Sequence, residues 1–438
     1  MTIKTDYSKT FSYARMQNGV QAVRSITFKN PEDQTITDAH LTVKFDPALS
    51  EGYSTVLSEI PAKGKMILDN VGVFPSASFL ANLTETIQGT MTVTCEAKGM
   101  ETVSENYPVS LHPYDFWEGI NSGGLLANFV LPNHPAVKPI LQRASAKLGQ
   151  WTGNPSLNAY LNANPNEVKK QMAAIYDALR EKGIAYANPP ASFAQQGQRI
   201  RLPEDILSSG IATCLDAALL YAGCLEASGL RPIVVLNEGH AYAGAWLIEK
   251  SSPYPVNDDP TILRKNSADG IDEILLVETT GFLKGYESPF DSAVAAADTT
   301  LLDIDSFLMF IDVCSARNMG LLPIPQRILT PEGYVIDEKT IYDGGIPARI
   351  DEADSIDVDK PAKVDRHIIW ERKLLDLSLR NNLVNIHTKK GSIQLAGAGA
   401  EMVVEMLEDG IGFKLFGIPT GWNGEMGDAG IFREIAPT

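Results

Sequence analysis

The first 112 residues alternate apolar and polar positions with a period of two. Leu41, Val43 and Phe45 alternate with Thr42, Lys44 and Asp46. A longer run places these apolar residues on one face: Ile87, Met91, Val93, Cys95 and Ala97. Period-two runs separated by Asn, Pro, Gly and Asp are typical of antiparallel strands that bury one face. We therefore expect residues 1–112 to fold as an antiparallel β-sandwich.

Beyond this region the hydrophobic period becomes that of an α-helix. In residues 165–183, Val168, Met172 and Leu179 recur at helical spacing, and Gly183 stands where such a helix would stop. The stretch 186–202 is rich in proline and glutamine and is expected to be a loop. Helical and strand patterns then alternate from about residue 204 to 330, which predicts one α+β domain over 113–335.

The length and these patterns predict a multidomain chain. At roughly 150 residues per domain, 438 residues correspond to about three domains. Several short strands within 1–112 favour an immunoglobulin-like module. We expect residues 336–366 to be a linker, because the stretch DEADSIDVDKPAKVD, near 350–366, is acidic and poor in large apolar side chains. Residues 367–438 begin with an amphipathic helix that places Trp370, Leu374 and Leu377 on one face, and we expect a short α/β C-terminal extension there.

The amino-acid composition and the net charge exclude several classes of function. Apolar residues make up 44% and charged residues 21%, as in soluble globular proteins. The net charge of −17 disfavours binding to nucleic acid or to anionic lipid. Four cysteines without a CxxC spacing argue against disulfides and structural zinc. With no signal peptide and no long apolar run, we expect a cytoplasmic protein that does not enter membranes.

One stretch combines the residue types of a thiol enzyme. Cys214 follows a loop of small residues and opens an apolar helix that Gly229 ends. A thiol at a helix N-terminus faces unpaired N–H groups and the positive end of the helix dipole, which favour the thiolate. The same N–H groups are plausible oxyanion donors. Cys214 is therefore the candidate nucleophile, although a buried cysteine at a helix start is often only structural.

Two predicted strands supply a base and a carboxylate. His240 opens the strand HAYAGAWLI, on a face that it shares with Tyr242 and Trp246. Glu278 lies in the apolar run ILLVETT, where a charge is costly without a partner. If the two strands are neighbours, His240 is that partner. The order of Cys214, His240 and Glu278 then corresponds to a nucleophile, a base and an orienting acid.

The arrangement of a helix cysteine, a strand histidine and a strand acid resembles the transglutaminase-like branch of the papain-like cysteine enzymes. The chain also resembles the N-terminal region of large bacterial proteins related to superfamily-one helicases, in which such a module precedes a helicase-associated domain of unknown function. The phrases that carry this resemblance span about residues 125 to 390: GQRIRLPEDIL, TCLDAALLYAGCLEASGL, GHAYAGAWL, LVETTGF, FIDVCSARNMGLLPIP and WERKLLDLSLRNNLVN.

The resemblance implies roles for individual residues. Cys214 would be the nucleophile, His240 the base, and Glu278 would occupy the position usually held by aspartate. Gln198, in the GQRIR phrase, would be an oxyanion-hole side chain. Tyr242 and Trp246, on the face of His240, are candidates to line a substrate cleft, although core packing is the alternative. This chemistry requires no metal or organic cofactor.

The resemblance also bears on the C-terminal segment and on partners. Residues 367–438 would be the beginning of the helicase-associated domain. The sequence has no GxxxxGK[ST] phosphate-binding motif. The chain is therefore expected to be either the N-terminal portion of a longer protein or a stand-alone relative, with a helicase module as a possible partner in cis or in trans.

Two functions remain open from the sequence. The first is a cysteine peptidase or amidase that acts on a protein or peptide. The sequence does not decide whether the acyl group passes to water, as in hydrolysis, or to an amine, as in a transglutaminase. The second is a catalytically inactive papain-like scaffold that serves as a protein-binding or regulatory module.

Overall fold

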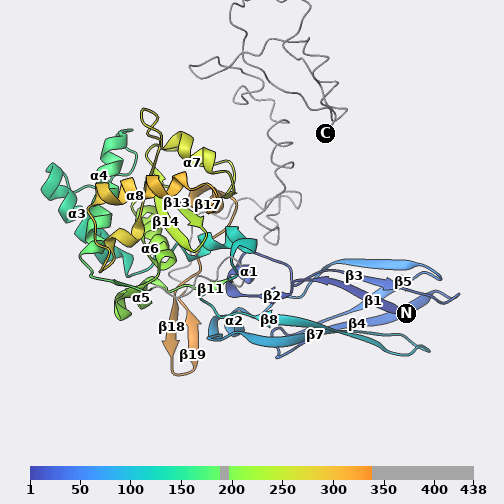
Figure 1. Ribbon diagram of the computed structural model, residues 1–438. Coiled ribbons are helices and arrows are strands. Elements are labelled where there is room, and N and C mark those ends of the chain that lie inside the picture. Colours follow the sequence, from blue (N-terminus) through green and yellow to red (C-terminus); the bar gives the residue numbers. More distant parts are fainter. Residues whose placement is uncertain (188–196, 338–438) are drawn as a thin grey trace, which may run out of the picture. The chain divides into compact units, whose positions relative to one another are not determined.

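The computed structural model describes residues 1–187 and 197–337. The chain divides into two compact units, Met1–Val364 and Asp365–Thr438, and every described residue belongs to the first. This part is mixed α/β with several sheets (Figure 1). Nearly all of the predicted linker 336–366, the whole predicted helicase-associated segment 367–438 and the middle of the predicted loop 186–202 lie outside the described residues.

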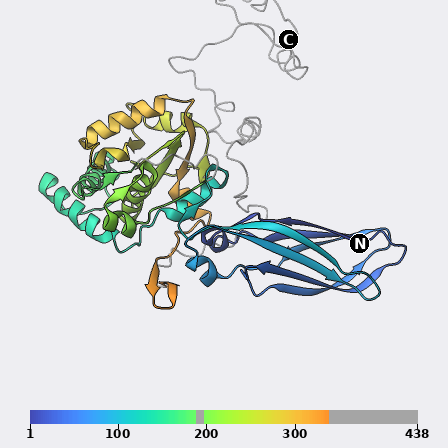
Figure 2. The same cartoon turned by 60° about the horizontal axis from the view of Figure 1, so that its bottom comes forward.

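Residues 2–111 form two sheets, drawn in blue and teal in Figures 1 and 2. The first has the strand order β1 (Thr2–Tyr7), β3 (Val23–Lys29) and β6 (Lys65–Val71). The second has the order β2 (Thr10–Phe11), β8 (Val103–Leu111), β7 (Ile87–Glu96), β4 (Ile36–Asp46) and β5 (Tyr53–Ile60). Neighbouring strands are antiparallel except β2 and β8.

The apolar positions of the period-two pattern correspond to the buried faces of strands β4 and β7. Leu41 and Val43 of β4 are fully buried, as are Met91, Val93 and Cys95 of β7. Leu41 lies opposite Cys95 and Val43 opposite Val93 in the sheet. The predicted alternation is therefore confirmed in the centre of both strands. It is wrong at Ile87, which is 38% exposed at the start of β7.

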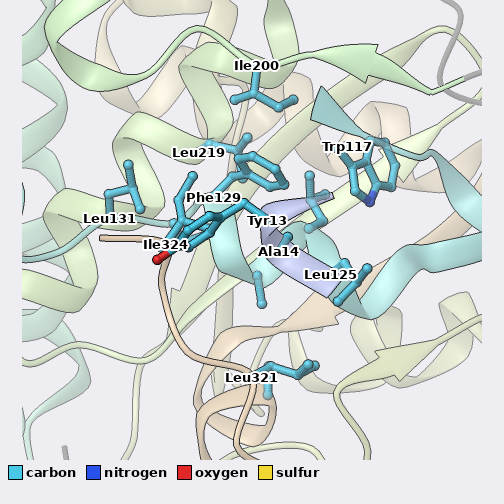
Figure 3. Packing of buried hydrophobic residues seen from close by; sticks show 14 of the residues in the cluster. Tyr13, Ala14, Trp117, Leu125, Phe129, Leu131, Ile200, Leu219, Leu321 and Ile324 are labelled. Atoms are coloured by element: carbon cyan, nitrogen blue, oxygen red, sulfur yellow. The ribbon is translucent and has the colours of Figure 1, made fainter. Parts of the chain in front are cut away.

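An apolar cluster joins the two-sheet part to the α/β part that follows. The connecting elements are α1 (Tyr13–Gln17), α2 (Ala77–Asn82), β9 (Phe116–Trp117) and the 3-10 helix η1 (Ile120–Phe129). Tyr13 of α1, Trp117 of β9 and Leu125 of η1 belong to this cluster together with Leu219 (Figure 3). Beside it, the Arg15 guanidinium lies 2.6 Å from the Glu118 carboxylate, and both side chains are less than 10% exposed.

Replacing Arg15 with leucine is expected to lower the free energy of unfolding by about 3 kcal/mol, because Glu118 would keep a buried charge without its partner. Adding Glu118→Leu should recover part of this loss, since the uncompensated charge is then gone. Urea denaturation of the two variants measures both effects. Arg24→Leu is the matched control, because the Arg24–Asp6 pair is largely exposed and should contribute less than about 1 kcal/mol. A double variant that recovers nothing would assign the loss to packing instead.

The centre of the α/β part is a five-stranded antiparallel sheet. Its strand order is β15 (Val256–Asn257), β17 (Phe307–Asp312), β13 (Pro232–Asn237), β14 (His240–Trp246) and β16 (Ile274–Val277). The helices are α3 (Val137–Thr152), α4 (Pro165–Arg180), α5 (Pro203–Ser209), α6 (Cys214–Ala227), α7 (Pro260–Asn266), η2 (Thr279–Phe282), α8 (Phe290–Leu302) and α9 (Val313–Asn318).

Three small strand pairs complete the described part. β10 (Ala185–Tyr186) runs parallel to β12 (Ile211–Ala212), β9 pairs with β11 (Gln198–Arg199), and β18 (Arg327–Thr330) forms a hairpin with β19 (Gly333–Ile336). Among the described residues, no helix is long and apolar enough to cross a membrane.

Different helices pack on the two faces of the central sheet. Alternate residues of β14 separate them, with Ala243 in the cluster that includes α6 and Trp246 in a second cluster with residues of α7 and α8. The two views place α6 and α8 on opposite sides of the strands (Figures 1 and 2). Helix α6 is buried along most of its length, which explains why its sequence is apolar all round.

Candidate active site

Helix α6 begins at Cys214, as the sequence predicted, because Thr213 caps it. The Thr213 hydroxyl accepts the N–H of Asp216, and the Asp216 carboxylate accepts the N–H of Thr213 in return. This reciprocal pair leaves the N–H groups of Cys214 and Leu215 without an acceptor among the described residues. Two unpaired donors therefore lie beside the thiol, whose residue is 7% exposed.

The charge of Asp216 is compensated from outside the helix. The carboxylate is fully buried and accepts the backbone N–H and the guanidinium of Arg201, at 2.9 and 3.0 Å. Arg201 itself is partly exposed. A buried anion two residues from Cys214 is thus paired with a cation, which limits its repulsion of a thiolate.

His240 opens β14 directly after a tight turn. Asn237 pairs with His240 across the hairpin, and Gly239 takes the positive φ of 70° that the turn requires. The imidazole Nε2 lies 2.7 Å from a carboxylate oxygen of Glu278. The Cys214 thiol also hydrogen-bonds the imidazole. Because Nε2 is paired with Glu278, Nδ1 is the ring nitrogen left for the thiol.

Glu278 does not belong to a strand, contrary to the prediction for ILLVETT. Strand β16 ends at Val277, and Glu278 caps the 3-10 helix η2. One carboxylate oxygen accepts hydrogen bonds from both the N–H and the hydroxyl of Thr280. The other is hydrogen-bonded to Nε2 of His240. These donors satisfy the largely buried carboxylate, and the contacts with Thr280 cap η2 directly after the strand ends. Glu278 nevertheless reaches His240, since β14 and β16 are neighbours.

The three groups influence one another electrostatically. Burial, the largest single influence, lowers the pKa of His240, but hydrogen bonds and negative charge from Cys214 and Glu278 raise it to about 10. Burial raises the pKa of Glu278, whereas its hydrogen bonds from His240 and Thr280 and the imidazolium charge bring it below the ordinary value. At neutral pH the pair is therefore an imidazolium beside a carboxylate.

The structure also places Tyr186 at the thiol, which sequence reasoning missed. Tyr186 lies opposite Ala212 in the β10–β12 pair, two residues before Cys214, and its hydroxyl hydrogen-bonds the thiol. Its ring packs edge-on against Tyr286, with centroids 5.1 Å apart. The sequence offered only a short apolar triplet before a proline-rich loop, and nothing in that pattern pairs residue 186 with residue 212.

Two predicted cleft residues are in the core. Tyr242 is fully buried and Trp246 is 1% exposed, within the cluster between the sheet and the α7–α8 side. The Trp246 ring N–H donates to Asp312. The prediction that they line a cleft is therefore wrong, because the face that they share with His240 is covered by helices beyond the first residue of β14.

Gln198 forms β11 beside β9, opposite Trp117, and is partly buried. No hydrogen bond joins its side chain to Cys214 or His240 among the described residues, so its role as an oxyanion donor stays a prediction. Cys95 and Cys224 are fully buried, and burial raises the pKa of both thiols. Within the ranges 1–187 and 197–337, no group of three or more His, Cys, Asp or Glu side chains is arranged to hold a metal ion.

Comparison of the sequence with protein-family models and with curated proteins finds no match.

Proposed function

We propose that this chain is a transglutaminase-like thiol enzyme that transfers an acyl group from a protein or peptide, most simply to water as a cysteine peptidase or amidase. The observation that carries the proposal is the His240–Glu278 contact of 2.7 Å beside a cysteine at the N-terminus of α6. A charged imidazole next to a thiol favours the thiolate, which is the nucleophilic form.

The proposed reaction has two halves. The Cys214 sulfur attacks the carbonyl carbon of an amide, and the electron pair of the C=O bond moves to oxygen. The tetrahedral adduct collapses, the C–N bond breaks, and the amine leaves with the proton from His240. His240 then takes a proton from water, which attacks the thioester and releases a carboxylic acid and the free thiol. Glu278 holds the ring and stabilises its charged form.

The finer description of the fold belongs to the same proposal. The two antiparallel sheets within residues 1–112 are consistent with an immunoglobulin-like sandwich. A helix that carries the cysteine, packed on an antiparallel sheet that carries the histidine, is consistent with a papain-like domain. We also propose that the chain acts beside a helicase-related module, on the strength of the resemblance, and in the cytoplasm, on the strength of its four widely spaced cysteines.

One observation favours the alternative of an inactive scaffold. Cys214 is only 7% exposed, so a substrate carbonyl has little free surface at the sulfur. An inactive module would tolerate a covered thiol, whereas an enzyme has to admit a carbonyl group. The two functions therefore differ in whether small electrophiles reach Cys214.

The test is the rate at which iodoacetamide alkylates each cysteine from pH 5 to 11, read by mass spectrometry. We expect Cys214 to react at least about tenfold faster than Cys314 at pH 6, because the imidazolium stabilises the thiolate. His240→Gln should remove this advantage, while His112→Ala should not. As the pH rises through about 10, His240 loses its proton, and the wild type should approach the His240→Gln variant. A Cys214 that stays unreactive at every pH would favour the scaffold.

A further inference from the structure

The strand that carries Tyr186 is tightly anchored beside the nucleophile. On one side, the N–H of Ala185 donates to Gly210 at 2.7 Å and the N–H of Ala187 donates to Ala212 at 2.8 Å. On the other side, the N–H of Lys284 donates to Ile184 at 2.7 Å. The Tyr186 backbone is thus held between the segment that leads into Cys214 and the segment that follows Glu278 and η2.

The Tyr186 side chain lies between Cys214 and Tyr286. Its hydroxyl reaches the Cys214 sulfur, and its ring is braced by Tyr286, which is 59% exposed. Burial, and then the charge and hydrogen bond of Cys214, raise the pKa of Tyr186 to about 12. The hydroxyl is therefore protonated at neutral pH and acts as a hydrogen-bond donor, not as a base.

We propose that the Tyr186 hydroxyl is the side-chain donor of the oxyanion hole, together with the backbone N–H of Cys214; this rests on the proposed function. When the sulfur bonds to the carbonyl carbon, the oxygen that gains the electron pair is attached to the same carbon. A donor that contacts the sulfur then needs only a small movement to reach that oxygen. Tyr186 would thus fill the role that the resemblance implied for Gln198.

The chemistry favours a hydroxyl at this position. The N–H groups at the start of α6 supply donors from one side only, and a tetrahedral oxyanion is stabilised best by two converging donors. In the tetrahedral adduct, before the C–N bond breaks, the sulfur is a neutral thioether and no longer needs a hydrogen bond. The Tyr186 hydroxyl is therefore released from the thiol at the moment when negative charge develops on oxygen.

The test compares Tyr186→Phe with the matched control Tyr286→Phe in the full chain, with two probes of Cys214. Iodoacetamide alkylates the sulfur without forming an oxyanion. An N-acetylated dipeptide aldehyde forms a tetrahedral hemithioacetal, whose oxygen occupies the oxyanion position, and it protects Cys214 from iodoacetamide. We expect Tyr186→Phe to weaken protection by the aldehyde at least about tenfold and to change the alkylation rate by less than about twofold. Tyr286→Phe should leave both unchanged.

Three results would overturn the inference. The first is aldehyde protection that is equal in the wild type and in Tyr186→Phe, and the second is an aldehyde that fails to protect a normally reactive wild type. The third is a tenfold faster alkylation of Tyr186→Phe, which would make Tyr186 a restraint on the thiol. A wild-type Cys214 that iodoacetamide does not modify at all is a different failure, because it removes the proposed function itself.

Discussion

Replacing Cys214 with alanine is expected to lower kcat/KM for amide hydrolysis at least about 10⁴-fold, because the acyl-enzyme can no longer form. The substitution removes one atom from a residue at the start of a capped helix, so the fold should persist. The measurement is cleavage of a mixed library of synthetic peptides, read by mass spectrometry, with circular dichroism to check that the variant is folded.

Cys314→Ala is the control for this variant. Cys314 is a free and partly exposed cysteine in α9, and neither His240 nor Glu278 contacts it among the described residues. We expect its replacement to leave cleavage unchanged. Cleavage that survives in Cys214→Ala and stops in Cys314→Ala would move the active site elsewhere and end the present assignment.

Replacing Glu278 with glutamine is expected to lower kcat by about 10² to 10⁴, because a neutral amide does not stabilise the imidazolium. The variant keeps the size of the side chain and a hydrogen-bonding oxygen for His240. Without the carboxylate, the pKa of His240 falls from about 10 towards its ordinary value. His240 in the variant therefore loses its proton at a lower pH than in the wild type, and the alkaline limb of the pH–rate profile should move towards neutrality.

The pH profile distinguishes this effect from simple misfolding. Glu278→Asp keeps the charge but shortens the side chain by one methylene, so it should retain the wild-type profile with a smaller loss of kcat. Thr280→Val removes one of the donors that anchor the carboxylate and should reduce kcat less than Glu278→Gln. An alkaline limb that stays in place in Glu278→Gln would show that Glu278 does not set the charge of His240.

Features that depend on local order along the chain were predictable. The start of α6 at Cys214 follows from a capping threonine, an acid three residues later and an apolar run, all of which act within one helical turn. The buried centres of β4 and β7 follow from period-two alternation, which is a property of the strand itself. The contact between His240 and Glu278 required one assumption beyond this, that their strands are neighbours.

Features that depend on which segments meet were not predictable. Tyr242 and Trp246 share a face with His240, as the alternation predicted, but the sequence does not show that helices cover this face. Glu278 caps η2 instead of extending the strand, and the second oxygen of its carboxylate is paired by His240 from the neighbouring strand.

The sequence by itself therefore placed Cys214 at the start of a helix and His240 at the start of a strand, because caps and periodicity act over a few residues. It also named Glu278 as the partner of His240. Only the tertiary structure decided that Arg201 neutralises Asp216 and that Tyr186 reaches Cys214. Those contacts join segments 15 and 28 residues apart through hydrogen bonds and strand pairing. Neither leaves a period or a motif in the sequence, so packing alone selects them.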